Sequence, residues 1–395
     1  MVQIIIFSLA NDLTGGNYRL LRMLQLFPKD NYIFAMPKNR KKNMLKLIKK
    51  YKMYEDFFYI INNAHELKEF EKGNRIDYIK YGLYIVEVAK KLGCKLVYFP
   101  HEHTYIPIGL RLGSLRYKIM WTELLQQTPV VGSLVKDHHN RFKLVAKNLS
   151  LYGYSSLKIV KSYLRLKAFK YAVGDTPILA VSRSIPYELK RLGVDANVIV
   201  VEPGNASDKC PFKNLNREYD VGFLARVVPE KGIFDFIKAI KILKEIIPDL
   251  KVYISGFIDS KNREKIINVL STLNLRIELR FNVTREEKFR LLASTKVLLY
   301  PTRADAFPTV VLEALSCGTP VVAYGIPAIR FNFDTHAVLK VEPLNVRGLV
   351  LATMQVLKEG LWESLENEAL NFASRFTWDR VAQAEWNILT TLAQS

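Results

Sequence analysis

The chain has 395 residues, enough for about two domains that each bury a core of their own. Its hydrophobic content of 49% is ordinary for a soluble protein. No run approaches the roughly 20 apolar residues that a membrane span needs, which argues against an integral membrane protein. The formal net charge of +20 is uneven: residues 1–200 carry 33 basic and 15 acidic side chains, and residues 201–395 carry 25 and 23.

The basic first half fits three kinds of partner: nucleic acid, an anionic membrane surface or an anionic substrate. A proteome rich in lysine explains it equally well, so composition does not decide between them. The three cysteines, Cys94, Cys210 and Cys317, are far apart in the sequence and lack metal-ligand spacing. We therefore expect buried thiols in a reducing cytoplasm.

Strands and helices alternate along the first half. The N-terminal apolar segment follows no basic residues, so it is typical of a first strand and not of a signal peptide. Strands are predicted at Gln3–Ser8, Tyr32–Met36, Phe57–Ile61, Lys95–Phe99, Ile178–Val181 and Asn197–Val201. Helices are predicted at about 16–27, 40–52, 75–92 and 184–192. Residues 104–173 are basic, aromatic and poor in strand patterns, and we expect two or three helices inserted there.

The second half alternates more clearly. Strands are predicted at Asp220–Arg226, Leu250–Ser255, Leu275–Phe281, Lys296–Tyr300 and Pro320–Tyr324. Helices are predicted at Lys231–Ile246, Lys261–Leu273 and Thr284–Ser294, the last opening with a capping box.

This alternation predicts an α/β protein with two doubly wound domains. We place an N-terminal domain at residues 1–201, with the basic helical insertion near 104–173, and a C-terminal domain at 202–376. Its first residues, 202–219, have turn chemistry and form the linker. A last amphipathic helix, within 377–395, opens after the N-cap residue Thr377.

The segment 301–320 is the most informative part of the chain. A strand runs into a polar loop, and Pro308 stands where the first turn of a helix should begin. Glu313 follows among apolar residues, where a carboxylate without a partner is costly to bury. A helix N-terminus binds anions, so this arrangement suits a nucleotide with its diphosphate on the helix and its ribose on Glu313. The alternative is that Glu313 is solvated at a helix edge.

Two basic residues, Arg226 and Lys231, bracket the turn after the strand that begins at Asp220. Cations at a helix N-terminus oppose the helix dipole, and a nearby anion would relieve that conflict. A diphosphate needs such cations. The alternative is a solvated basic pair.

The first domain offers weaker signals. Gly15 and Gly16 follow the first strand and would let the backbone approach a ligand, although such a pair is more often a simple turn. His101 and His103 follow the strand that begins at Lys95, and either is a candidate proton donor or sugar ligand. A metal site on this loop lacks a third ligand, so we expect no metal.

Together these residues resemble the GT-B fold glycosyltransferases, specifically glycosyltransferase family 4. Its first signature is matched by Gly222–Arg226 and Lys231-Gly232, and its second by Asp305–Ala314. The resemblance implies that Arg226 and Lys231 bind the donor diphosphate and that Glu313 binds the ribose. Asp305 stands where the family usually has Glu, which leaves its reach to the donor sugar open.

The resemblance implies further roles. Backbone N–H groups near Thr309 and Val310 should meet the phosphates, and Gly15 and Gly16 should lie against them. His101, which we prefer to His103, should lie near the donor sugar, so that His101 and Asp305 form the catalytic pair. The last helix should cross back to the first domain.

The expected enzyme is therefore a hexosyltransferase-like glycosyltransferase with two Rossmann-like domains facing a central cleft. It would transfer a sugar from a nucleotide-sugar, a co-substrate, to an acceptor hydroxyl with retention and without metal or other cofactor. The basic, aromatic segment around Tyr105, Trp121 and Tyr152 suits an anionic lipid surface, so a lipid-linked or glycan acceptor at the cytoplasmic membrane face is our hypothesis. A soluble acceptor is the alternative. Three other functions compete with this one: a sugar-nucleotide epimerase, a non-catalytic protein that binds nucleotide-sugars, and a nucleic-acid-binding protein. The sequence has no recognisable nucleic-acid-binding motif, so we expect no nucleic acid partner.

Overall fold

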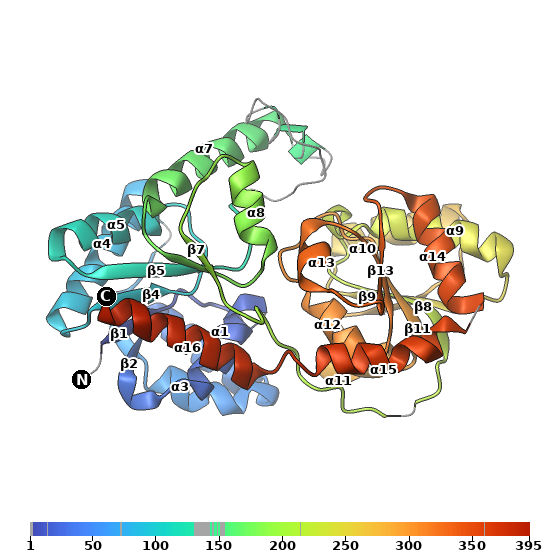
Figure 1. The fold of residues 1–395 in the computed structure, drawn as a ribbon, viewed down its shortest axis with the longest axis horizontal. Helices are drawn as coiled ribbons and strands as arrows, with labels where there is room; N and C mark the ends of the chain where they lie inside the picture. Colours follow the sequence, from blue (N-terminus) through green and yellow to red (C-terminus); the bar gives the residue numbers. More distant parts are fainter. Residues whose placement is uncertain are drawn as a thin grey trace.

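The structure is a computed structural model that describes residues 3–13, 15–71, 73–129, 143, 146–147, 149–150, 155–213, 215–358 and 360–395. The chain forms two domains, each built on a parallel sheet (Figure 1). The first sheet has seven strands in the order β3-β2-β1-β4-β5-β6-β7, and the second has six in the order β10-β9-β8-β11-β12-β13. Every strand pair among the described residues is parallel. The predicted α/β architecture with two Rossmann-like domains is confirmed.

The first domain contains strands β1 to β7 and helices α1 to α8. Its strands are β1 (Ile4–Phe7), β2 (Tyr32–Pro37), β3 (His65–Leu67), β4 (Leu96–Phe99), β5 (Met120–Leu125), β6 (Ile178–Ala180) and β7 (Val198–Val200). Its helices are α1 (Gly15–Leu26), α2 (Lys38–Lys50), α3 (Phe58–Asn62), α4 (Arg75–Lys91), α5 (Ile106–Tyr117), α7 (Ser156–Val173) and α8 (Ser184–Arg191), with short 3₁₀ turns η1 (Lys29–Asn31) and η2 (Lys52–Phe57).

The second domain contains strands β8 to β13 and helices α9 to α15. Its strands are β8 (Tyr219–Leu224), β9 (Val252–Gly256), β10 (Glu278–Phe281), β11 (Thr295–Tyr300), β12 (Val321–Tyr324) and β13 (Val338–Val341). Its helices are α9 (Ile233–Ile246), α10 (Ser260–Thr272), α11 (Arg285–Ala293), α12 (Thr309–Ser316), α13 (Pro327–Asn332), α14 (Val346–Lys358) and α15 (Leu361–Ala373), preceded by the 3₁₀ turn η3 (Pro229–Lys231). The expected capping box is present, because Thr284 and Glu287 each accept the other's backbone N–H.

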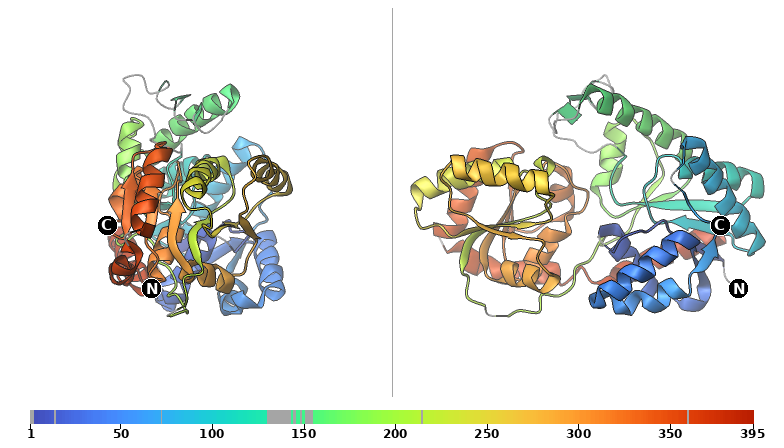
Figure 2. Two further views of the ribbon diagram at one scale, coloured as in Figure 1. Left: turned by 90° about the vertical axis from the view of Figure 1, so that its right-hand side faces the viewer. Right: turned by 180° about the vertical axis from the view of Figure 1, so that it is seen from behind.

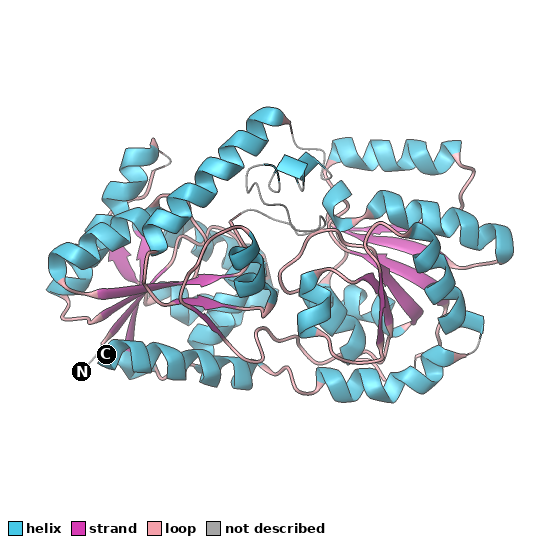
Figure 3. Ribbon diagram, turned by 45° about the horizontal axis from the view of Figure 1, so that its top comes forward, coloured by secondary structure: helices cyan, strands magenta, loops and turns pink. Residues whose placement is uncertain are grey.

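The central strands are buried on both faces because helices cover both sides of each sheet (Figures 2 and 3). All four residues of β1 and all four of β12 are buried, and their sequences are continuous apolar runs. A run of this kind, rather than an alternating one, is typical of a strand with no solvent-facing side.

The prediction of a strand at Phe57–Ile61 is wrong. These residues end η2 and form most of α3, and Phe57 and Ile61 are buried while Phe58 and Tyr59 are exposed. Burial at positions four apart is the pattern of a helix, which a short apolar run does not distinguish from a strand. The strand at this edge is β3, whose first two residues are exposed.

The segment 104–173 contains two helices, as expected, in α5 and α7, but a strand between them was not predicted. This segment contains β5, which pairs with both β4 and β6 and therefore belongs to the sheet. Trp121 and Leu124 are buried there. The aromatic residues Tyr152 and Tyr154, like the loop pair His138 and His139, lie outside the described residues.

The C-terminal helix α16 (Trp378–Gln394) leaves the second domain and packs on α1, β1 and β4 of the first (Figure 1). Thr377 caps it as expected, by accepting the N–H of Arg380. On its buried face Glu385 accepts hydrogen bonds from Arg19 at 2.6 Å and from the Tyr98 hydroxyl at 2.7 Å. The chain thus passes between the domains twice, through residues 201–218 and through residues 374–377. No helix in the described ranges has both the length and the hydropathy that crossing a bilayer requires.

Candidate active site

The carboxyl ends of both sheets border the contact between the domains. Ser184, at the start of α8 after β6, donates a hydrogen bond to the carbonyl of Ala306, which follows β11 (3.4 Å). Arg285, at the start of α11 after β10, donates to the Tyr18 hydroxyl of α1 (2.6 Å). Ligands of open parallel sheets bind at the carboxyl ends of the strands, so the candidate residues should lie along these two edges.

Lys231 ends the turn that follows β8. Its Nζ atom lies 2.6 Å from Oδ2 of Asp305 and 3.1 Å from the carbonyl oxygen of Ala304. The next residue, Gly232, has a φ of +76°, and a Cβ atom there would stand 1.8 Å from the carbonyl oxygen of Pro301. Only glycine fits this position, which holds the β8 turn against the loop after β11.

Asp305 is bound by three partners from its own domain. Besides Lys231, the Tyr300 hydroxyl donates to Oδ2 at 2.8 Å and the Ala306 N–H donates to Oδ1 at 2.9 Å. Burial and the Asp305 charge raise the pKa of Tyr300 well above its usual value, so the hydroxyl remains a donor. The sequence predicts an anion beside Lys231. In this structure that anion is the Asp305 carboxylate.

The side chain of Arg226 is exposed, and no hydrogen bond or ion pair joins its guanidinium to the described residues. The N–H of the next residue, Val227, donates to the carbonyl of Phe257 at 2.9 Å, which fixes the turn beside the loop after β9. The guanidinium is therefore positioned at this edge and remains available to an anionic ligand.

Helix α12 begins at Thr309, and Pro308 is its N-cap residue rather than part of its first turn. The N–H groups of Thr309 and Val310 belong to the first turn, which has no intrahelical acceptors for them. The Val310 side chain is buried, so only its backbone can meet a ligand.

Glu313 is neither solvated nor without a partner. Its Oε1 atom lies 2.5 Å from Nζ of Lys288 on α11, and its side chain is 16% exposed. Lys288 was not identified from the sequence, since nothing in the motif around Glu313 indicates which cation a neighbouring helix brings to it.

In the first domain, Nε2 of His101 lies 2.7 Å from Oγ of Ser8, at the end of β1. The same hydroxyl accepts the N–H of Ala10 at 3.0 Å, so it joins the loops that follow β1 and β4. Loss of hydration lowers the pKa of His101 to about 4, which keeps the imidazole neutral at pH 7.

His103 serves a different purpose. Its Nδ1 atom accepts the N–H groups of Tyr105 and Ile106, both at 3.1 Å, and so caps the start of α5. Glu102 between the two histidines accepts the backbone N–H groups of Gln126 and Gln127. Of the two histidines, His101 is the one whose side chain contacts the β1 loop.

Gly15 and Gly16 begin α1, and Gly15 has a φ of +51°. A Cβ atom on Gly16 would stand 1.8 Å from Oε1 of Gln126, whose Nε2 in turn donates to the carbonyl of Pro100 at 3.3 Å. Gln126, which the sequence did not single out, therefore joins the glycine loop to the loop that carries His101. In the ranges that the structure describes, no three His, Cys, Asp or Glu side chains are grouped so that they could hold a metal ion.

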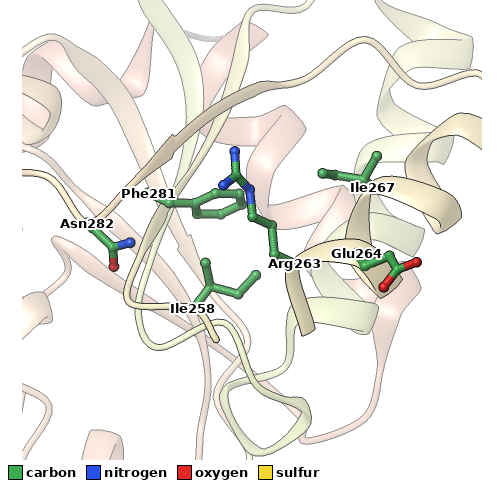
Figure 4. A pocket seen from close by; sticks show the side chains of 6 residues that line it. All are labelled: Ile258, Arg263, Glu264, Ile267, Phe281 and Asn282. Carbon is green, nitrogen blue, oxygen red and sulfur yellow. The ribbon is translucent and has the colours of Figure 1, made fainter. Parts of the chain in front are cut away.

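A pocket of about 380 Å³ lies at the same edge of the second sheet (Figure 4). It is bounded by the loop after β9, the end of β10 and one face of α10, and Figure 4 shows the Arg263 guanidinium over the Phe281 ring. Its lining residues are Ile258, Arg263, Glu264, Ile267, Phe281 and Asn282. Since Phe257 accepts the N–H of Val227, this pocket adjoins the turn that carries Arg226.

Comparison with known proteins agrees with this geometry. Residues 208–369 match the family model described as glycosyl transferases group 1. The chain is 26% identical over 339 residues to an uncharacterized glycosyltransferase of Methanocaldococcus jannaschii, covering 84% of this chain and 85% of the relative.

Two solved structures share the fold over nearly the whole chain. Sucrose-phosphate synthase of Thermosynechococcus elongatus superposes with a TM-score of 0.73 at 15% identity, with all of both chains covered. HepE of Anabaena, solved with UDP and glucose, superposes with a TM-score of 0.71 at 14% identity, covering 99% of this chain and all of that one. The chain is thus a glycosyltransferase of the GT-B fold, and its residues 208–369 match the glycosyl transferases group 1 family.

Proposed function

We propose that this enzyme transfers a sugar from a nucleoside diphosphate sugar to an acceptor hydroxyl, with retention at the anomeric carbon, as a member of glycosyltransferase family 4. The observation that carries the proposal is that Arg226, Lys231 and the N-terminus of α12 all follow the carboxyl ends of two neighbouring strands, β8 and β11. The Arg226 guanidinium, the Lys231 ammonium that Asp305 holds and two backbone N–H groups are hydrogen-bond donors for the oxygens of a diphosphate. The relative from Anabaena was solved with UDP and glucose, which suits this class of donor.

The diphosphate would lie between Arg226 and the first turn of α12, with Lys231 behind it. As the glycosidic bond breaks, negative charge grows on the leaving phosphate, and fixed cations stabilise that charge without reorganising. Asp305 and Tyr300 hold the Lys231 ammonium in place, so Asp305 acts here as a positioning residue. The proposal uses these cations, and no metal or other cofactor, to neutralise the leaving group.

The nucleoside would extend along the same edge. Glu313 is proposed to accept the ribose hydroxyls, which would then share its carboxylate with Lys288. The pocket beside Phe281 is proposed to take the base, because its apolar walls suit a flat ring and it adjoins the Arg226 turn.

The donor sugar would face the first domain. His101, held neutral and bonded to Ser8, is proposed to hydrogen-bond a sugar hydroxyl, and the Gly15-Gly16 loop is proposed to lie against the phosphates. The acceptor hydroxyl would attack from the face that the leaving group departs, with the phosphate taking its proton. Excluding water between the domains would limit hydrolysis of the donor.

The acceptor is proposed to be a glycan or a lipid-linked molecule at an anionic membrane surface on the cytoplasmic side. Helix α7 supports this: its side chains Leu157, Val160, Leu164 and Tyr171 are 65%, 44%, 54% and 57% exposed. They recur at helical spacing among exposed lysines, which are Lys158, Lys161, Lys167 and Lys170. Apolar residues flanked by lysine favour binding at a lipid interface.

A thermal-shift screen against UDP, GDP, ADP and their sugars tests the donor assignment. We expect one nucleoside diphosphate to raise the melting temperature of the wild type and to have a much smaller effect on Arg226→Ala. The matched control is Arg276→Ala, an exposed arginine at the opposite edge of the same sheet, which should respond like the wild type. Product analysis then separates the functions: sugar turnover without an acceptor would show an epimerase, and binding without any turnover would show a non-catalytic relative.

Sedimentation with vesicles tests the membrane assignment. The wild type should bind phosphatidylglycerol vesicles at low salt, and Leu157→Ser with Leu164→Ser should weaken that binding several-fold. Leu351→Ser, an equally exposed leucine of α14 in the second domain, is the control. Absence of binding at low salt would overturn the lipid surface and leave the soluble acceptor.

A further inference from the structure

Two of the three cysteines meet in space although 107 residues separate them. Cys210 lies in the linker before β8, and Cys317 is the residue that ends α12. Their sulfur atoms are 2.6 Å apart, while Cys94 is buried in the first domain, in a separate core cluster. The separation of the two sulfur atoms exceeds the length of a disulfide bond by only about 0.6 Å.

We propose that Cys210 and Cys317 form a reversible disulfide site, which ties the linker between the domains to the end of the donor-binding helix α12. In the structure the two thiols already lie within hydrogen-bonding distance of each other. The expectation of buried thiols holds for Cys94 and Cys317, whereas Cys210 is only half-buried and is paired with Cys317.

The surroundings of the two thiols indicate which of them reacts first. Cys210 is half-buried and can be reached from solvent, whereas Cys317 is 7% exposed. The hydrogen bond from Cys317 and the nearby charge of Arg217 lower the pKa of Cys210, and burial raises the pKa of Cys317. Arg217 is fixed there, because its guanidinium donates to Cys317 O at 3.3 Å and to Gly318 O at 3.2 Å. Cys210 is therefore the first nucleophile.

The oxidant of this reaction is a low-molecular-weight disulfide such as oxidised glutathione. The Cys210 thiolate attacks one glutathione sulfur, and the other glutathione leaves as a thiolate. Cys317 then loses its proton, attacks Cys210 and displaces the second glutathione. The protein loses two hydrogens, and two molecules of reduced glutathione form.

The bond would act where the two domains meet. Asp208, two residues before Cys210, accepts a hydrogen bond from Nε1 of Trp378 at 2.9 Å and pairs with Arg285. The Tyr18 hydroxyl of α1 donates to the same carboxylate at 3.3 Å. A covalent link at Cys210 would therefore join α12 to a segment that already contacts the first domain and the start of α16.

Disulfide mapping on the full chain tests the proposal. The protein is incubated with oxidised glutathione, quenched in acid, denatured, alkylated and digested, and the peptides are weighed. We expect a peptide pair joined through Cys210 and Cys317, with Cys94 fully alkylated and with reversal by dithiothreitol. The proposal would be overturned if Cys210 and Cys317 were recovered as alkylated thiols, or if either were linked equally often to Cys94. The measurement uses the wild-type protein, so it does not depend on the folding of a variant.

Single variants test the order of reaction. Cys317→Ser should accumulate glutathione on Cys210, while Cys210→Ser should leave the buried Cys317 unmodified. Cys94→Ser is the matched control and should form the Cys210–Cys317 bond as the wild type does. The assignment of Cys210 as the first nucleophile would be contradicted if the Cys210→Ser variant carried as much glutathione on Cys317 as the Cys317→Ser variant carries on Cys210.

Discussion

Lys231 and Asp305, 74 residues apart in the chain, form an ion pair of 2.6 Å with side chains that are 13% and 18% exposed. The pair joins the turn after β8 to the loop after β11, the two neighbouring strands at the centre of the second sheet. A cation held in this way keeps its position whether or not a ligand is present, which is the preorganisation that stabilising a leaving group requires.

Replacing Lys231 with alanine should therefore impair the chemical step. We expect kcat/KM to fall by about 100-fold or more, since a fixed charge at the leaving phosphate is lost. The measurement is initial-rate kinetics with the nucleotide-sugar found in the thermal-shift screen. Lys238→Ala, an exposed lysine of α9, is the control, and an equal loss in both variants would contradict the assignment.

The Glu313 carboxylate should contribute to nucleotide affinity. Hydrogen bonds to a charged group are worth about 1.5–3 kcal/mol, so Glu313→Gln should weaken nucleoside diphosphate binding by roughly tenfold or more in calorimetry. Lys288→Ala removes the present partner of the carboxylate and should retain binding. If Lys288→Ala weakened binding as much as Glu313→Gln, the ion pair itself and not the carboxylate would be the binding element.

Stability should decline toward alkaline pH because of Glu123. This residue is 1% exposed, one of its oxygens lacks a hydrogen-bond partner, and burial with the Glu102 charge raises its pKa well above 4.5. The unfolded chain releases that proton above about pH 4.5 while the folded chain retains it, so the free energy of unfolding falls as pH rises, by up to about 1.4 kcal/mol per pH unit. Glu123→Gln should be more stable than the wild type in urea at pH 8 and nearly equal at pH 4.

Glu102 should add to the same decline over a narrower range, because burial raises its pKa to about 7. Its contribution therefore ends near pH 7. A urea titration series in which Glu123→Gln leaves the pH dependence unchanged from pH 5 to pH 8 would contradict a protonated Glu123.

On the acid side, the histidines should limit stability. Loss of hydration lowers the pKa of both His101 and His103 from 6.5 to about 4. Between these values the unfolded chain binds protons that the folded chain does not, so the contribution of the two histidines to stability falls as pH decreases from about 6.5 to about 4. It opposes the contribution of Glu123 and Glu102 over the same range. His101→Asn should reduce this slope in urea unfolding, and His65→Asn, at an exposed residue, should leave it unchanged.

Breaking the buried ion pair of helix α16 should destabilise the protein. Arg19 and Glu385 are 3% and 0% exposed, so Glu385→Ala would leave a buried guanidinium without its partner, at a cost of about 3–5 kcal/mol. Urea unfolding measures this loss. Gln383→Ala on the exposed face of the same helix should change stability by less than about 0.5 kcal/mol.

From β8 to β12 the second domain was predicted accurately, because signals such as the capping box at Thr284 mark where a helix begins. The elements that follow β12, which are α13, β13, α14 and α15, were not predicted. In the first domain, Phe57 and Ile61 make a run too short to separate helix from strand. The strand β5 was missed because Thr122 and Glu123 interrupt its apolar pattern, although both are buried.

The sequence proposed the residues of the candidate site but did not predict which residues pair with them. Local patterns identified Arg226, Lys231, Asp305 and Glu313, because a motif is read along the chain. The partners Lys288 and Gln126 come from other elements, and only the packing of those elements brings them within hydrogen-bonding distance. Tyr300 lies five residues before Asp305, at the end of β11. The contact between Cys210 and Cys317 likewise depends on packing and could not be predicted from the sequence.

The double passage of the chain between its domains has a mechanical consequence. A protease that cuts once within residues 201–218 would leave the two halves attached through residues 374–377 and the docked α16. The two connections also restrict the motion of one domain relative to the other. The domains can rotate about the line that joins the two connections, but they cannot separate. Scission of the backbone at the first passage should therefore give two fragments that still co-elute as one particle until denaturant is added.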